Sequence, residues 1–405
     1  MEAAPASRSV TPPRTARWVA PLYHKLLDRI DAGLVEGAID AILPDGTRRL
    51  LGGHRPGPLA IVRILRWNAL WRLVSAGSVG WYEGWEAGDW SSPDPVPIFD
   101  LFMRNRAALG NVARAKHVAR WAGRLIHRGR RNDRAGARRN IAAHYDLGND
   151  FYREWLDPSL TYSSALFADG DRALDGAQQR KLDAILDRTG VAAGGSVLEI
   201  GCGWGSFAAT AAARGVAVHA ITLSQEQHDH VAARALPGVT VSITDFRDVT
   251  GCYDGVASIE MVEAIGPENW DGYLATIANV LRPGGRAAIQ LIAIAPDVWE
   301  SYASNIDFIQ RYIFPGGSLI AEPRFRVLAE RHGLAWRDRR SFGLDYAETL
   351  KQWRERFEAA VREERLPARF DARFRRLWRY YLMYCEGGFR GGGIDVAQVT
   401  LVKQG

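Results

Sequence analysis

The second half of the chain alternates short apolar runs with helix-like stretches, and this alternation restricts the possible folds more than any other feature. A helical pattern at 174–188 comes first, and a turn is predicted at Arg282-Pro-Gly-Gly before the last apolar run. The apolar runs lie at 195–200, 216–222, 239–243, 255–259 and 286–292. Strands that alternate with helices at this spacing predict an α/β fold with a doubly wound, mostly parallel sheet. Ligands of such sheets bind outside the carboxyl ends of the strands.

The first apolar run ends in a glycine-rich turn that contains Glu199, Gly201, Gly203 and Gly205. Its G-x-G-x-G spacing differs from the G-x-G-x-x-G of dinucleotide sites, and the sequence has no phosphate-binding G-K-[ST]. An acidic residue at this turn favours a ligand that carries a cation and no phosphate. S-Adenosylmethionine is such a ligand, because it combines a sulfonium, an α-amino group and a ribose. The turn therefore predicts a methyltransferase, and Asp245-Phe246 after the third strand offers a carboxylate and a ring to the adenine.

Composition and patterning predict four segments along the 405 residues. They are a disordered tail (1–17), an N-terminal domain (18–112), a basic amphipathic linker (113–140) and a methyltransferase domain (141–405). The tail lacks the apolar core of a signal peptide, and no uncharged apolar run of about 18 residues predicts a transmembrane helix. The three cysteines show no metal-ligand spacing, so we expect no metal site and a reducing cytosol.

Two sequence segments leave alternatives open. The stretch from Ala113 to Arg139 holds many bases and one acid, which suits either an anionic membrane surface or a solvated linker helix. A glycine-rich segment contains four clustered aromatic residues, Trp81, Tyr82, Trp85 and Trp90. Such a cluster suits either an interfacial or substrate-contacting loop or packing between small elements, and packing is the commoner case. The net charge is only +6 and no nucleic-acid recognition motif occurs, so methylation of nucleic acid is disfavoured.

Several separated motifs occur in a specific order from about His144 to the C-terminus. They are AHYDLGNDFYREWLDPSLTYSSALF (143–167), VLEIGCGWGSFA (197–208), ITLSQEQ (221–227), MVEAIG (261–266), FIQRYIFPGG (308–317), DYAETLKQW (345–353) and YYLMYCEGGFRGGGIDVAQV (380–399). Together they resemble the cyclopropane-fatty-acyl-phospholipid synthase family, which includes the mycolic acid cyclopropane synthases. The region before residue 143 looks like the N-terminal domain of the full-length bacterial synthases.

The resemblance implies a class I S-adenosylmethionine methyltransferase fold, Rossmann-like with helical additions and a smaller N-terminal domain. It implies methyl transfer to the cis double bond of an unsaturated phospholipid acyl chain, followed by proton loss and closure of a cyclopropane. In the family a bound bicarbonate is thought to remove the proton. The expected partner is phospholipid at the membrane surface, with a cytoplasmic protein peripherally attached to the inner face, and a homodimer is possible.

Residue by residue, the resemblance implies two sets of site residues. The predicted cofactor contacts are Tyr162, Ser163, Glu199, Gly201, Gly203, Gly205, Thr222, Gln227, Asp245 and Phe246. The predicted catalytic positions are Tyr145 near the sulfonium, Cys385 as the family's active-site cysteine, and Ser164, Glu263, Gln290, Ile292 and Tyr346 around the bicarbonate.

Two of these positions depart from the family pattern. Ser164 stands where many members have cysteine, and Gln290 stands where many have histidine. Both side chains can hydrogen-bond an oxyanion, but glutamine cannot accept a proton near neutral pH. The alternative activity is therefore methylation of the double bond without ring closure, giving a methylene- or methyl-branched chain. A lipid- or cofactor-binding protein that has lost catalysis is a further alternative.

Overall fold

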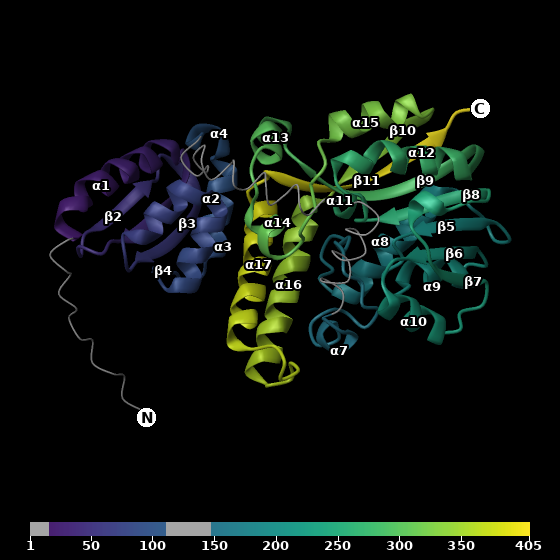
Figure 1. The fold of residues 1–405 in the computed structure, drawn as a ribbon, viewed down its shortest axis with the longest axis horizontal. Helices are drawn as coiled ribbons and strands as arrows, with labels where there is room; N and C mark the ends of the chain where they lie inside the picture. The colour runs from purple at the N-terminus through teal and green to yellow at the C-terminus, as the bar shows by residue number, and fades with distance from the viewer. Residues whose placement is uncertain (1–15, 111–146) are drawn as a thin grey trace. The chain divides into compact units, whose positions relative to one another are not determined.

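The computed structural model describes residues 16–110 and 147–405, and the chain divides into two compact units, Met1–Lys116 and His117–Gly405 (Figure 1). The predicted basic linker at 113–140 and Tyr145 lie outside the described residues. Within the described ranges no helix is long and apolar enough to cross a bilayer.

The N-terminal unit is built on a four-stranded mixed sheet with the strand order β2-β1-β3-β4. Its elements are α1 (Ala16–Gly33), β1 (Glu36–Ile42), β2 (Arg48–Gly52), β3 (Arg55–Ile64), α2 (Asn68–Ala87), β4 (Trp90–Ser91), α3 (Val96–Arg104) and α4 (Arg106–Leu109). The tryptophan-rich segment is part of its core: Trp81 and Trp90 stack with ring centroids 4.3 Å apart, and the Trp90 indole donates to the Trp81 carbonyl. These aromatic side chains are therefore packed inside the unit.

The C-terminal unit contains a seven-stranded sheet with the order β10-β11-β9-β8-β5-β6-β7. The strands are β5 (Ser196–Ile200), β6 (Ala217–Thr222), β7 (Val239–Ile243), β8 (Tyr253–Ile259), β9 (Leu281–Ile294), β10 (Leu334–Ser341) and β11 (Ile394–Lys403). Strands β5 to β9 pair in parallel, and β11 runs antiparallel to both β9 and β10. The predicted doubly wound, mostly parallel sheet is confirmed.

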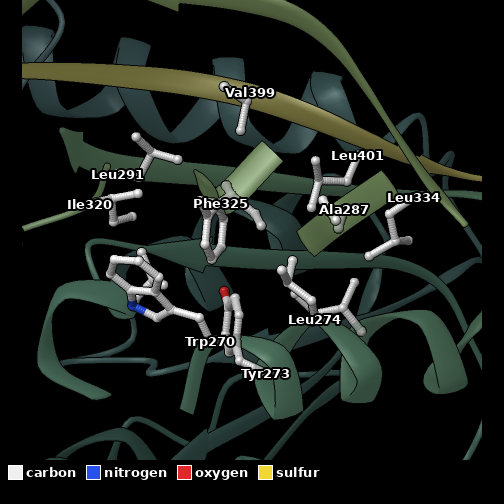
Figure 2. Packing of buried hydrophobic residues seen from close by; sticks show 14 of the residues in the cluster. Trp270, Tyr273, Leu274, Ala287, Leu291, Ile320, Phe325, Leu334, Val399 and Leu401 are labelled. Carbon is white, nitrogen blue, oxygen red and sulfur yellow. The ribbon is translucent and has the colours of Figure 1, made fainter. Parts of the chain in front are cut away.

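Helices cover both faces of this sheet, as Figure 1 shows. The described helices of this unit are α7 (Asn149–Tyr152), α8 (Leu174–Thr189), α9 (Ser206–Ala213), α10 (Gln225–Ala233), α11 (Val262–Ile265), α12 (Trp270–Val280), α13 (Pro296–Ala303), α14 (Phe308–Tyr312), α15 (Glu322–Arg331), α16 (Gly343–Arg362) and α17 (Ala372–Arg390), with 3-10 turns η1 (Phe246–Asp248) and η2 (Pro267–Asn269). Successive strand residues point to opposite faces, so one face packs on α8 and α9 and the other on α12 and α15. Figure 2 shows α12 side chains grouped with those of β9, β11 and Phe325.

The predicted turn at Arg282-Pro-Gly-Gly is wrong, because these residues belong to β9, which begins at Leu281. Tyr253 of β8 pairs with Leu281 and Gly255 pairs with Arg286, so the extra residues bulge out of the ladder. Gly284 lies in this bulge with φ = 75°, a left-handed conformation that glycine adopts without strain. The signal for a turn and the signal for such a bulge are the same residues.

Candidate active site

The carboxyl ends of β5 and β8 lie side by side in the middle of the sheet. β5 pairs with β6 on one side and with β8 on the other, so the chain winds away in both directions from this point. Crevices at such a reversal of strand order are the preferred ligand sites of α/β sheets. A pocket opens here, and eight of the predicted cofactor residues line it: Tyr162, Ser163, Glu199, Gly201, Gly203, Thr222, Gln227 and Phe246.

The glycine turn after β5 has a left-handed backbone at all three glycines. Gly201, Gly203 and Gly205 have φ angles of 80°, 51° and 79°. A Cβ on Gly201 would lie 2.9 Å from the Met261 sulfur, whereas a Cβ on Gly203 would meet nothing within 4 Å. The backbone at Gly203 therefore borders open space on the pocket side. Gly205 does not line the pocket but is the N-cap of α9, so its role in the structure is to end the turn.

Glu199 is the acidic residue that borders this turn, and its side chain is buried. Its Oε2 has no hydrogen-bond partner among the described residues. Burial raises the pKa of this carboxyl to about 8, although the nearby Lys181 charge opposes the shift. A buried acceptor without a partner is costly, so this oxygen is suited to a ligand that brings a donor or a positive charge.

Lys181 of α8 lies in the same pocket and was missed by the sequence analysis. It is fully buried, and its Nζ donates to the Ser163 hydroxyl at 2.6 Å. Burial lowers the pKa of Lys181 to about 8, while the charges of Glu260, Asp157 and Glu199 act in the opposite direction. The available signal was its spacing: Lys181 lies four residues after Ala177 and four before Ile185, on the face of α8 that is buried.

The ends of β6 and β7 complete the pocket wall. The Thr222 hydroxyl donates to the Gln227 side-chain carbonyl at 2.7 Å, and Ser224 caps the start of α10 by accepting from the Gln227 amide N–H. Phe246 lines the pocket after β7. Asp245 does not line it, because its carboxylate is held by Arg247 at 2.6 Å and by the Arg247 backbone N–H. The predicted adenine contact of Asp245 stays a prediction.

Glu260, the residue directly after β8, is the centre of a second polar cluster that the sequence analysis also missed. Its Oε1 accepts from the Ser164 backbone N–H and from the Gln290 amide, each at 2.8 Å. Its Oε2 accepts from the Tyr346 hydroxyl at 2.8 Å. Three predicted catalytic residues therefore meet at one carboxylate. Its place directly after a strand, at the ligand edge, was the signal in the sequence.

Glu263 lies three residues after Glu260 and binds the backbone of Ile292, another of the predicted catalytic positions. Its Oε1 accepts from the Ile292 backbone N–H, and its Oε2 is buried without a hydrogen-bond partner among the described residues. Burial first, and then the charge of Glu260, raise the pKa of Glu263 to about 8. At neutral pH this carboxyl is mainly protonated.

Cys385 of α17 lies near Tyr346 and Tyr381, on the side of the cluster formed by the helix pair α16 and α17. Burial raises the pKa of its thiol above the usual value, so the sulfur is protonated at neutral pH. The Tyr162 and Tyr381 hydroxyls are 2.8 Å apart, and the Tyr162 ring packs against Trp353. The site thus has an aromatic wall beside the two carboxyls.

Comparisons with known proteins agree with this geometry. The family described as mycolic acid cyclopropane synthetase matches residues 132–399. Tuberculostearic acid methyltransferase UfaA1 of Mycobacterium tuberculosis is 38% identical over 92% of this chain and 86% of its own length. Cyclopropane-fatty-acyl-phospholipid synthase of Escherichia coli is 34% identical over 85% of this chain and 88% of its own. The crystal structure of mycolic acid cyclopropane synthase CmaA1 with SAH and CTAB superposes with a TM-score of 0.62 at 31% identity, covering 66% of this chain and 98% of that one.

The family match spans more than half of the chain, and it includes the strand ends, the glycine turn and both carboxylate clusters described above. The predicted family, fold and enzyme class are confirmed together. The chain belongs to the mycolic acid cyclopropane synthetase family and is an S-adenosylmethionine-dependent methyltransferase.

Proposed function

We propose that this enzyme transfers the methyl group of S-adenosylmethionine to the cis double bond of an unsaturated phospholipid acyl chain and then removes a proton to form a cyclopropane. The observation that carries the proposal is the pocket between the ends of β5 and β8, which is lined by Glu199, whose Oε2 has no hydrogen-bond partner among the described residues, and by the aromatic rings of Tyr162 and Phe246. One side of this pocket suits a cation and the other an apolar chain.

The residues present fit the methyl donor, which supplies an electrophilic methyl on a sulfonium when it is bound. Glu199 would accept hydrogen bonds from the donor's amino group or ribose, and the backbone at Gly203 leaves room for close approach. Thr222 and Gln227, already fixed by their mutual hydrogen bond, would bind the ribose side, and Phe246 would contact the adenine face. The charge of Lys181 favours the ionised forms of Glu199 and Glu260, against the effect of burial.

The aromatic residues have two roles in this proposal. Tyr162 and Tyr346 offer π faces to the carbocation that forms on the acyl chain after methyl transfer. Trp353, Tyr381 and Tyr162 pack together and keep water away from that cation. Exclusion of water matters because water would trap the cation as an alcohol before the proton is removed.

The second candidate is methylation without ring closure, giving a methylene- or methyl-branched chain. The similarity to UfaA1, named as a methyltransferase and not as a cyclopropane synthase, favours it and extends over 92% of this chain. Both activities share the methyl transfer. They differ in whether the electron pair of the broken C–H bond closes a ring or, after a hydride shift, forms a double bond.

We propose phospholipid bilayers as the substrate, reached from the cytoplasmic face by peripheral binding. The experiment supplies S-adenosylmethionine with a trideuterated methyl group and vesicles of a monounsaturated phosphatidylglycerol, and analyses the released fatty acids by mass spectrometry. Cyclopropane or methylene products retain two of the three deuterium atoms, because the third is removed from the transferred methyl group as a deuteron. Derivatisation then distinguishes the ring from the methylene. If the acyl chains carry no deuterium after incubation with the enzyme and the labelled donor, the proposal is refuted.

A further inference from the structure

Glu260 is the polar group that the family resemblance leaves without a role. It follows β8 with φ = 51°, one of five non-glycine residues with positive φ in the described part of the chain. Such a backbone persists only where the surroundings hold the residue in place, and it occurs preferentially at functional sites. The half-buried side chain lines the same pocket as Glu199.

The donors around Glu260 are the ones that the sequence analysis assigned to a bicarbonate. The Ser164 N–H, the Gln290 amide and the Tyr346 hydroxyl all point at its carboxylate, and the Ile292 N–H is taken by Glu263. A free bicarbonate would have to displace a carboxylate of the chain to find these donors. The residues present therefore do not fit a bound bicarbonate.

The orientation of the Gln290 side-chain amide is fixed, so that its NH₂ group and not its carbonyl faces Glu260. Its side-chain carbonyl accepts from the Gln398 amide at 3.1 Å, and the Gln398 carbonyl accepts from Arg188 Nε at 3.2 Å. The Gln290 NH₂ group consequently faces Glu260 at 2.8 Å and the Ser164 carbonyl at 3.3 Å. Because both ends of the amide are used, it has no free donor for another anion.

We propose that the Glu260 carboxylate is the built-in base of this enzyme and takes the place that bicarbonate has in the family. A carboxylate has about four lone-pair sites. Two hydrogen bonds reach Oε1 and one reaches Oε2, which leaves a lone pair on Oε2 for a proton. Burial raises the pKa of Glu260, which strengthens it as a base, while the charge of Lys181 and the three donors favour its ionised form.

The step rests on the proposed function and is balanced. A C–H bond of the transferred methyl group breaks, its proton binds Glu260 Oε2, and its electron pair forms the last carbon–carbon bond of the ring. If a hydride shift comes first, the same electron pair forms the double bond of a methylene product. Glu260 leaves the step as a neutral acid and returns its proton to water when the product departs.

The test compares the wild type with Glu260→Gly and Glu260→Gln in buffer freed of carbon dioxide, with and without about 20 mM added bicarbonate, chosen to exceed a weak millimolar Kd. Glu260→Gly removes the carboxylate and the left-handed strain together, leaving three donors around an empty space. Glu260→Gln keeps the space filled by an amide that cannot accept the proton. Glu364→Gly is the matched control, because Glu364 has φ = 54° and is exposed.

We expect the turnover of the wild type to be independent of bicarbonate. Glu260→Gly should lose at least about 100-fold in turnover, the scale of general-base catalysis, and recover at least about 10-fold with bicarbonate. Glu260→Gln should lose as much without recovery, and Glu364→Gly should match the wild type. Added bicarbonate should also raise the melting temperature of Glu260→Gly by several degrees and leave the other three proteins unchanged, since only that variant gains a ligand.

Bicarbonate-dependent turnover or melting of the wild type, or a Glu260→Gln variant as active as the wild type, would overturn the assignment. The melting measurement needs no catalysis, so it tests the anion site even if the lipid is not the substrate. Unlabelled lipid from the wild type would refute the proposed function, whereas bicarbonate-stabilised Glu260→Gly would still support a carboxylate in the anion's place.

Discussion

The two strand ends that form the active site both turn through left-handed backbone conformations, but they use different residues to do so. After β5 the chain turns through left-handed conformations at Gly201, Gly203 and Gly205, where glycine carries little cost. After β8 it turns through one at Glu260, where a side chain costs about 1–2 kcal/mol. The first end is shaped to let a ligand approach the backbone. The second accepts strain to place a carboxylate.

The carboxylates at the two strand ends, Glu199 and Glu260, also differ in whether the chain itself satisfies their hydrogen bonds. Glu199 is buried with an oxygen that has no partner among the described residues, which suits an external donor. Glu260 is bound by three donors of the chain itself. At these two strand ends, the oxygen without a partner lies where the methyl donor is proposed to bind, and the carboxylate bound by the chain lies where the proposed base is needed.

The largest effect is expected from the β5 end. Gly203→Val should weaken binding of S-adenosylhomocysteine by more than about 100-fold, because the new side chain enters the open space of the pocket and strains a backbone with φ = 51°. Isothermal titration calorimetry measures the change. Gly170→Val is the matched control, since Gly170 is exposed, has φ = 76° and also faces open space; its affinity should stay at the wild-type value.

The next largest effect is a difference in S-adenosylmethionine affinity between variants of Glu199 and Glu260. Glu199→Gln should weaken binding of S-adenosylmethionine by about 10- to 100-fold, because the positive charge of the bound donor favours the ionised form of Glu199 and an amide cannot make that charge-assisted hydrogen bond. Glu260→Gln should leave that affinity within about 3-fold, because its carboxylate serves the chain's own donors. Calorimetric titration of both variants with S-adenosylmethionine measures the two affinities. Equal losses of affinity would mean that Glu199 and Glu260 do not differ in their contact with the donor.

The raised pKa of Glu199 also predicts how stability depends on pH. Between pH 4.5 and about 8 the folded state holds a proton on Glu199 that the unfolded state has lost, so stability falls as pH rises through this range. Glu199→Gln should make that decline shallower by up to about 1.4 kcal/mol per pH unit. Urea denaturation at a series of pH values between 5 and 8 measures the slopes. An unchanged slope would mean that Glu199 is ionised in the folded protein.

The smallest effect is expected at Glu263. At neutral pH its carboxyl is mainly protonated and serves the Ile292 N–H, a contact that an amide oxygen can also make. Glu263→Gln should therefore lower turnover by less than about 10-fold at pH 7, whereas Glu263→Ala should cost more, because it leaves that N–H unpaired. Steady-state turnover of both variants with vesicle substrate tests this. A Gln variant as inactive as Glu260→Gln would make Glu263 a second base.

The predictions from the sequence were best where local pattern and function coincide. The strand at 239–243 was predicted at its observed bounds, and the glycine turn lies at the predicted sheet edge. They were poorest where several elements converge. Lys181 was missed because lysine is seldom buried, yet the fold places it near three acids whose charges favour its protonated form.

The sequence by itself determined the doubly wound sheet and the glycine turn, because hydrophobic periodicity and glycine spacing act over a few residues. The family followed from the resemblance of several motifs in a specific order. Only the tertiary structure decided what Ser164, Gln290 and Tyr346 bind. They come from three distant segments, and each was assigned to a bound bicarbonate because it matches a family position. Folding brings them to one strand end, where the carboxylate of Glu260 already occupies the position that their donors address.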